Sequence, residues 1–246
     1  MIPAAKQAIR GLFNTGVSDN NLVYKFNLYD ESVTQKLWAS AHYLRSLRDL
    51  DINKYLVGPT MASGTISTGD VFVPHPLLDT PRFCYELNRL LDGFFMNSMS
   101  TLDTLGHQIY TLYECRSIPA RIYIRTATEM LIREHPNCKL GPFLSSRLGS
   151  RWFSEFEPFR HCTTHESLIR IEDIDIGYDP IMTCYHLVKQ IKLPNDPQST
   201  PFKYTRNRKA IEYCGSLFSK IQSLIDRAYD NILADIRSNS NTVPAP

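Results

Sequence analysis

Hydrophobic side chains recur every three or four positions over several long stretches of the chain, which is the pattern of amphipathic helices. The first clear stretch covers residues 31–49, and its apolar positions are Val33, Leu37, Trp38, Ala41, Leu44 and Leu47. A run rich in Gly, Pro, Ser and Thr follows over residues 56–80 and breaks the helical pattern. We therefore treat residues 1–80 as an N-terminal segment of helix plus loop, to which the pattern assigns no fold or function.

The longest hydrophobic stripe begins near residue 80 and continues to residue 112. Thr80 and Pro81 suit the N-cap and the first turn of a helix. A single helix over these residues would span roughly 50 Å at 1.5 Å per residue. Gly93 and Gly106 interrupt the stripe, so the pattern leaves two possibilities open: one helix that forms the spine of a bundle, or two helices broken near either glycine.

Four further patterns complete the helical part of the chain. They predict helices over residues 117–134, 142–157 and 180–191, and Pro158 is expected to end or kink the second of these. A repeat of apolar residues from Ile211 to Ile232 predicts a final long helix over 211–236, and the polar residues 238–246 predict a disordered tail. The predicted class is all-α, with a bundle of long amphipathic helices over 81–237 behind an irregular N-terminal segment.

Composition narrows the class of protein. The chain has 246 residues, 43% of them hydrophobic, which is enough for one large folded domain or two small ones. Its net charge of +2 excludes nucleic-acid binding by bulk charge and leaves only local basic patches. No stretch approaches the ~18 consecutive apolar residues of a membrane helix, and no secretory signal is recognisable. Six dispersed cysteines without a C-x-x-C pair favour reduced thiols. We expect a soluble, cytoplasmic protein with no membrane partner.

One short polar segment, residues 159–166, carries side chains suited to chemistry on a phosphate. Arg160 can hold a phosphate through two hydrogen bonds because its guanidinium is planar and permanently charged. His165, with an ordinary pKa near ~6.5, can accept and donate a proton at neutral pH. Together they suffice for metal-free transesterification of RNA, in which the ribose 2′-hydroxyl is the nucleophile. On a straight helix the two would lie about 140° apart, so they converge only at a helix end or bend, or across a symmetric interface.

Two other interpretations of this segment stay open. The first is a structural helix turn in which Arg160 forms an ion pair with Glu157 or Glu166. The second is a zinc site, for which the sequence shows no fourth ligand. The three zinc ligands would be His161, Cys162 and His165. Our prediction is that the protein uses no metal and no cofactor.

The R-x4-H spacing of Arg160 and His165, late in an all-α chain and ahead of a long terminal helix, resembles the HEPN superfamily (higher eukaryotes and prokaryotes nucleotide-binding domain) over about residues 80–237. The helix expected at 80–112 also carries Asp103, and is similar to the family's long helix with an acidic or polar residue facing the motif. The resemblance implies Arg160 and His165 as catalytic residues, with His161 and Asp103 supporting them. It also implies a helical bundle that dimerises and places two motifs in one cleft.

The function implied by this resemblance is that of a metal-independent endoribonuclease, a hydrolase of the kind found among toxins and phage-defence effectors. The implied partners are a second copy of the chain, RNA, and an antitoxin or nucleotidyltransferase. Because silent members of the superfamily are common, the alternative is a helical binding or dimerisation module without catalysis. Residues 1–80 lie outside the resemblance.

A second basic feature precedes the last predicted helix. Four cations fall within seven residues, beside one aromatic side chain. The segment is either a solvent-exposed stretch that leads into the helix, or a surface that binds RNA phosphates and carries an aromatic ring for base stacking. The predicted RNA-binding residues are Lys203, Tyr204, Arg206, Arg208 and Lys209. Arginines at positions 116, 121 and 125 would extend this surface only if the fold brings them near.

Overall fold

The computed structural model describes residues 4–12, 20–57, 77–116, 121–162, 176–179, 184–187, 191–198, 203–206 and 208–240. Over these ranges the protein is mostly helical, with seven α-helices and three pairs of very short strands. The prediction of an all-α class is confirmed at this level.

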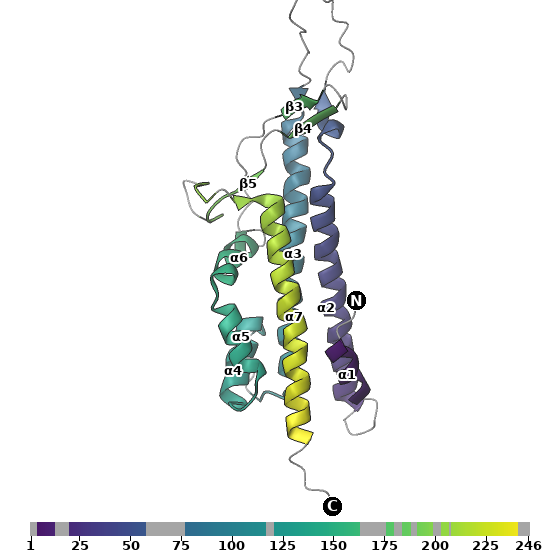
Figure 1. The fold of residues 1–246 in the computed structure, drawn as a ribbon, viewed down its shortest axis with the longest axis vertical. Helices are drawn as coiled ribbons and strands as arrows, with labels where there is room; N and C mark the ends of the chain where they lie inside the picture. The colour runs from purple at the N-terminus through teal and green to yellow at the C-terminus, as the bar shows by residue number, and fades with distance from the viewer. Residues whose placement is uncertain are drawn as a thin grey trace, which may run out of the picture.

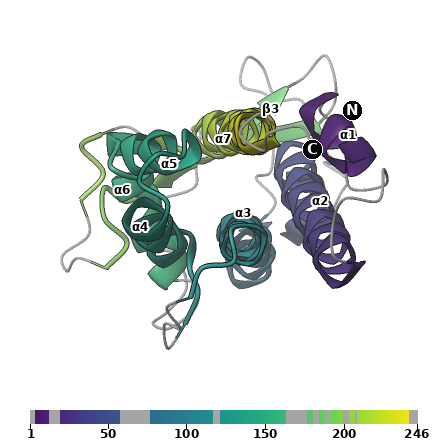
Figure 2. The same cartoon turned by 90° about the horizontal axis from the view of Figure 1, so that it is seen from below.

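Three long helices form the body of the molecule: α2 (Asn20–Arg48), α3 (Thr80–Leu112) and α7 (Ala210–Ser240). The helix α2 packs along α3, and both contact α7 (Figure 1). A layer of three shorter helices covers the other side of α3: α4 (Ile124–Glu134), α5 (Leu140–Leu148) and α6 (Arg151–His161). Viewed end-on, α3 lies between this layer and α2, while α1 (Ala4–Leu12) packs on α7 (Figure 2). The N-terminal helices are therefore packed onto the bundle.

The helix α3 is one continuous helix. It begins with the Asp79 side chain as N-cap, which accepts a hydrogen bond from the Arg82 N–H, and with Pro81 in its first turn. Gly93 and Gly106 do not break it, because each allows a close approach. A Cβ on Gly93 would lie 2.3 Å from the Tyr43 ring, and one on Gly106 would lie 2.9 Å from the backbone of the residue that opens α4.

Several predicted boundaries are corrected. The helix α2 begins at Asn20, well before residue 31, and α7 continues to Ser240, past the expected start of the tail. The helix expected over 142–157 is two helices, α5 and α6, and Pro158 lies inside α6. The helix expected over 117–134 begins at Ile124; residues 117–120 and 241–246 lie outside the described ranges.

The prediction of a helix over residues 180–191 is wrong. The strand β4 (Cys184–Leu187) pairs antiparallel with β3 (Ile176–Asp179), close to the 3₁₀ turn η2 (Ile52–Tyr55). A short apolar run does not distinguish strand from helix by periodicity alone, and aromatic and β-branched residues favour the strand. The other pairs are β1 (Leu56–Val57) with β2 (Leu77–Leu78), and β5 (Lys192–Leu193) with β6 (Arg208–Lys209).

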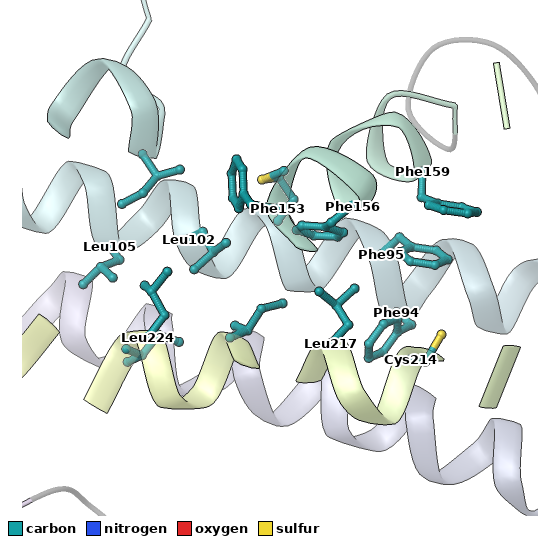
Figure 3. Packing of buried hydrophobic residues seen from close by; sticks show 14 of the residues in the cluster. Phe94, Phe95, Leu102, Leu105, Phe153, Phe156, Phe159, Cys214, Leu217 and Leu224 are labelled. Atoms are coloured by element: carbon teal, nitrogen blue, oxygen red, sulfur yellow. The ribbon is translucent and has the colours of Figure 1, made fainter. Parts of the chain in front are cut away.

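A cluster of buried phenylalanines fixes α6 against α3 (Figure 3). The rings of Phe95 and Phe159 stack with their centroids 5.0 Å apart, and Phe156 packs beside them. Burial of Phe159 gives a reason for α6 to continue beyond Pro158, although proline removes one backbone hydrogen bond. Because Phe159 is anchored, the next residue, Arg160, has a defined place at the edge of α3.

A buried ionic cluster connects four helices. Asp30 of α2 is fully buried and forms ion pairs with Lys6, at 2.6 Å, and with Arg10 of α1. The Tyr229 hydroxyl of α7 donates to Asp30 Oδ1 at 2.8 Å and lies 2.9 Å from Gln108 Oε1 of α3. Burial of a carboxylate is tolerated only when its oxygens are paired and hydrogen-bonded, as they are here.

A second buried carboxylate joins α7 to α5. Asp235 accepts hydrogen bonds from the backbone N–H groups of Lys139 and Leu140, at 2.8 and 3.2 Å, and from the Tyr113 hydroxyl at 2.7 Å. Lys139 stands at the N-cap of α5 and its side chain makes no capping hydrogen bond. Asp235 therefore supplies, from another helix, the acceptor that the start of α5 needs.

No described helix is long and apolar enough to cross a membrane. The five cysteines whose side chains are described are free thiols: Cys84, Cys115, Cys138, Cys162 and Cys214.

Asp92 of α3 is expected to make folding stability depend on pH. Burial raises the pKa of its carboxyl group to about 6, and its Oδ1 atom is buried without a hydrogen-bond partner. Since the folded protein then holds the proton more tightly than the unfolded chain, the stability contributed by Asp92 is fully present below pH ~4 and is lost as the pH rises through about 6. The Asp92→Asn variant should lack this decline and melt a few degrees higher than the parent at pH 8.

Thermal melts of both proteins at pH 5 and pH 8 test this expectation. Asp49→Asn, at an exposed position just beyond α2, is the matched control and should melt like the parent at both values. An unchanged pH profile in the Asp92 variant would show that another group controls the decline.

Candidate functional site

A pocket of about 570 Å³ lies where α6 meets α3 and the segment that opens α4. Met99 and Asp103 contribute from α3, and Phe153, Glu157, Arg160 and His161 from α6. The remaining lining residues are Tyr123, Ile124, Arg125, Thr126 and Glu129. Three of the four predicted catalytic residues thus line one pocket: Arg160, His161 and Asp103.

Arg160 faces Asp103 across this pocket. One guanidinium nitrogen lies 4.0 Å from Asp103 Oδ2, and both side chains are partly buried. The two residues are far apart in sequence, and the packing of Phe159 on α3 brings them together. The structure therefore places Asp103, the acidic residue that the resemblance implied would face the motif, opposite Arg160.

Asp103 also supports the backbone. Its Oδ1 atom accepts a hydrogen bond from the N–H of Ile124, the first residue of α4, at 3.2 Å. Burial raises the pKa of Asp103, while this hydrogen bond and the charges of Arg160 and Lys36 oppose the rise. Asp103 thus connects the start of α4 to the arginine of α6.

Tyr123 is a site residue that the sequence did not reveal. The guanidinium carbon of Arg160 lies 5.7 Å from the centre of its ring, within the range of a cation–π contact. Arg121 donates to the Tyr123 hydroxyl at 3.2 Å, and this hydrogen bond lowers the pKa of the phenol. Tyr123 falls inside the helix expected over 117–134, and nothing in that pattern distinguished it from its neighbours; the structure makes it the N-cap residue of α4.

One wall of the pocket is an ion pair between helices. Arg125 of α4 donates two hydrogen bonds to the Glu157 carboxylate of α6, at 2.6 and 2.7 Å, and its guanidinium lies over the Phe153 ring. In the structural interpretation of the motif, Glu157 was one proposed partner of Arg160. The structure gives Glu157 a two-point pair with Arg125 instead.

Two nitrogen-bearing side chains, Lys36 of α2 and His107 of α3, lie near Asp103. Lys36 Nζ donates to Thr104 Oγ1 at 2.6 Å, and burial lowers the pKa of this lysine. His107 follows Asp103 by one turn of α3, stacks on the Tyr29 ring, and has its pKa lowered by burial and by Lys36. These shifts favour a neutral imidazole at His107.

His161 ends α6 and is exposed at the pocket. His165 and Glu166 lie outside the described residues, so the position of His165 relative to Arg160 stays a prediction. Within the described ranges, no three His, Cys, Asp or Glu side chains gather in a way that could hold a metal ion. Cys162, one ligand of the zinc alternative, is buried.

The basic segment before α7 is divided by the fold. Arg208 is only 7% exposed, pairs with Glu155 at 3.1 Å, and donates to the Pro194 and Asn195 carbonyls. Its guanidinium also lies over the Phe159 and Tyr213 rings, so Arg208 is a packing residue and not part of an exposed RNA-binding surface.

The rest of this segment stays at the surface. Arg206, half exposed, also pairs with Glu155 at 3.1 Å, and Lys209 lies 3.3 Å from Glu212. Lys203 is exposed and Tyr204 is half-buried. An RNA-binding role for these four residues remains a prediction. Arg125, one of the three arginines considered as an extension of this surface, lines the pocket beside Arg160.

No family model matches the chain, and the comparisons with curated proteins and with solved structures likewise give no match.

Proposed function

We propose that the protein is a metal-independent endoribonuclease of the HEPN type, with its active site in the pocket of Arg160. The observation that carries the proposal is the meeting of Arg160 with Asp103 over Tyr123, in a pocket that His161 also lines. A fixed guanidinium, a carboxylate that orients it and an adjacent histidine are the groups that phosphoryl transfer without a metal requires.

In the proposed reaction the 2′-oxygen of a ribose attacks the neighbouring phosphorus. His165, acting as the general base, accepts the proton of the 2′-hydroxyl as the new O–P bond forms. Arg160 stabilises the negative charge that builds on the phosphoryl oxygens. The bond from phosphorus to the 5′-oxygen then breaks, and this oxygen takes a proton from His161 or from another histidine that acts as the general acid. The products are a 2′,3′-cyclic phosphate and a free 5′-hydroxyl.

Two neighbours adapt the pocket to a nucleotide. The Tyr123 ring holds the Arg160 guanidinium on one side and offers a flat apolar surface for a base. The pair of Arg125 with Glu157 forms another wall of the pocket, and Arg160 faces Asp103 at 4.0 Å. The proposed substrate is therefore single-stranded RNA, whose bases are free to stack.

We also propose that the protein forms a homodimer. Tyr85 and Met96 are exposed on α3, and their spacing from Asp103 puts all three on one face of the helix. A two-fold contact over this face would bring two Arg160 pockets together and cover apolar surface. The resemblance adds a role as a toxin or defence effector in the cytoplasm, with an antitoxin or nucleotidyltransferase as partner.

A silent binding module is the second candidate, and one observation favours it. Asp103 already accepts a hydrogen bond from Ile124 while it faces Arg160, as a structural ion pair between helices would. In that case the pocket binds a phosphate group without cleaving it.

Incubation of the pure protein with mixed RNA, with and without EDTA, distinguishes these functions. Cleavage should persist in EDTA and leave 2′,3′-cyclic phosphate ends, because no step uses a metal. Activity that disappears with EDTA and returns with a divalent ion would contradict this mechanism. RNA binding without cleavage of any RNA would favour the silent module.

A further inference from the structure

A second pocket, of about 510 Å³, lies between α7 and the junction of α5 with α6. It shares no described lining residue with the pocket of Arg160. The residues that matter are Arg147 of α5, Trp152 of α6, and Ser216, Ser219, Lys220 and Ser223 of α7.

The charge of this pocket is positive. Among the described residues that line it, Arg147 and Lys220 are cationic and none is acidic. The Arg147 guanidinium lies over the Phe143 ring at 5.7 Å, and Arg227 of α7 lies over the same ring at 5.2 Å. Like charges held on one ring repel each other, and a bound anion would relieve this repulsion.

The pocket also has a fixed aromatic wall and a row of hydroxyl groups. Trp152 is half-buried, and its ring meets Phe153 edge-on at 5.5 Å, which holds it in place. The three serines are three, four and seven positions apart on α7, so these exposed residues share one face of the helix, where the Ser219 hydroxyl donates to the Gly215 carbonyl and keeps its capacity to accept. Hydroxyls both donate and accept hydrogen bonds, as base edges and sugars require.

The start of α6 adds a further attraction for an anion. Trp152 is the second residue of this helix, so its positive dipole end lies at the pocket. The side chain of the N-cap residue, Ser150, bonds to the Arg147 carbonyl and does not cap the helix. Cations, a ring, hydroxyls and a helix start thus converge on one volume.

We infer that this pocket binds a nucleotide unit, with its base on Trp152 and its phosphate between Arg147 and Lys220. The unit is supplied either by a free mononucleotide or by a segment of single-stranded RNA, since both present the same chemistry. The inference does not depend on the proposed cleavage at Arg160.

Fluorescence of Trp152 tests the inference directly. The chain has two tryptophans, so Trp38→Phe leaves Trp152 as the only one. In this background, with Arg160→Gln added to prevent cleavage, the protein is titrated with AMP, with a short oligouridylate and with inorganic phosphate. We expect saturable quenching with AMP or with the oligouridylate, because the base stacks on the ring.

Arg147→Gln and Lys220→Gln should each weaken this binding about tenfold, the scale of a charge-assisted contact. Lys25→Gln, an exposed cation on α2, should leave it unchanged. Quenching by AMP as tight as by the oligouridylate identifies a free nucleotide, and quenching by the oligouridylate alone identifies an RNA strand. Lack of quenching with every probe would overturn the inference. So would equal binding of inorganic phosphate and AMP, or full binding by the Lys220 variant, whose exposed position should not affect folding.

Discussion

Replacement of Arg160 with glutamine is expected to lower RNA cleavage by ~10²-fold or more while the protein remains folded. Arg160 lines the pocket and faces Asp103, and glutamine removes its charge while keeping much of its length. Arg160→Lys should recover part of the activity, because an ammonium keeps the charge but not the two-point geometry. Initial rates on a short RNA, with helix content measured by circular dichroism, provide the test. Arg45→Gln, an exposed arginine of α2, is the matched control.

The same assay of RNA cleavage tests the role of His165. The His165→Ala variant should lose a similar factor, since a positioned acid–base group contributes ~10²–10⁴-fold. If each cleft takes Arg160 from one subunit and His165 from the other, a mixture of Arg160→Ala and His165→Ala chains should recover part of the rate. Light scattering on the same samples gives the oligomeric state. Full activity in the Arg160→Gln variant would place the active site elsewhere, and an active monomer would exclude the shared cleft.

The largest expected effect on stability is that of Asp30→Ala, at ~3–5 kcal/mol, because the substitution leaves buried cations without their counter-charge. Lys6 is nearly as buried as Asp30, and the Tyr229 hydroxyl loses one of its two acceptors as well. For a chain of this size the loss corresponds to a fall in melting temperature on the order of 10 °C.

Urea unfolding followed by circular dichroism measures this change. Glu31→Ala, at the exposed neighbouring position, is the control and should change stability by no more than about 0.5 kcal/mol. A loss at Asp30 no larger than that at Glu31 would mean that the ionic cluster is not formed in solution.

The parts of the fold that the sequence predicted well are those in which local signals agree. For α3, a proline in the first turn and a long hydrophobic stripe predicted its start and extent, and only the N-cap shifts from Thr80 to Asp79. The pattern left one helix or two open, and the structure decides for one. The strand β4 was missed because its apolar run is too short for periodicity to separate strand from helix. Its pairing with β3 is a contact between segments, which the local pattern does not contain.

The candidate site likewise contains residues that were predicted and residues that were missed. The placement of Asp103 opposite Arg160 came from the family resemblance, since no periodicity relates the two residues. Tyr123 was missed because its contact with Arg160 depends on how the start of α4 meets α6. Arg208 was assigned to the surface because a cation in a basic run gives no sign of burial. Its carboxylate partner, Glu155, lies on α6, far away in the sequence.

The Asp30 cluster also has a consequence for the order of events during synthesis. Lys6, Arg10 and Asp30 are translated before Tyr229, which is made 199 residues after Asp30. A nascent chain therefore presents this carboxylate and its cations without the Tyr229 hydroxyl until about two thirds of α7 has been translated. Closure of such a distant contact is slow compared with the formation of single helices. Folding of the bundle is therefore completed only when α7 packs onto the earlier helices. A chain halted before Tyr229 should remain sensitive to protease at α1 and α2.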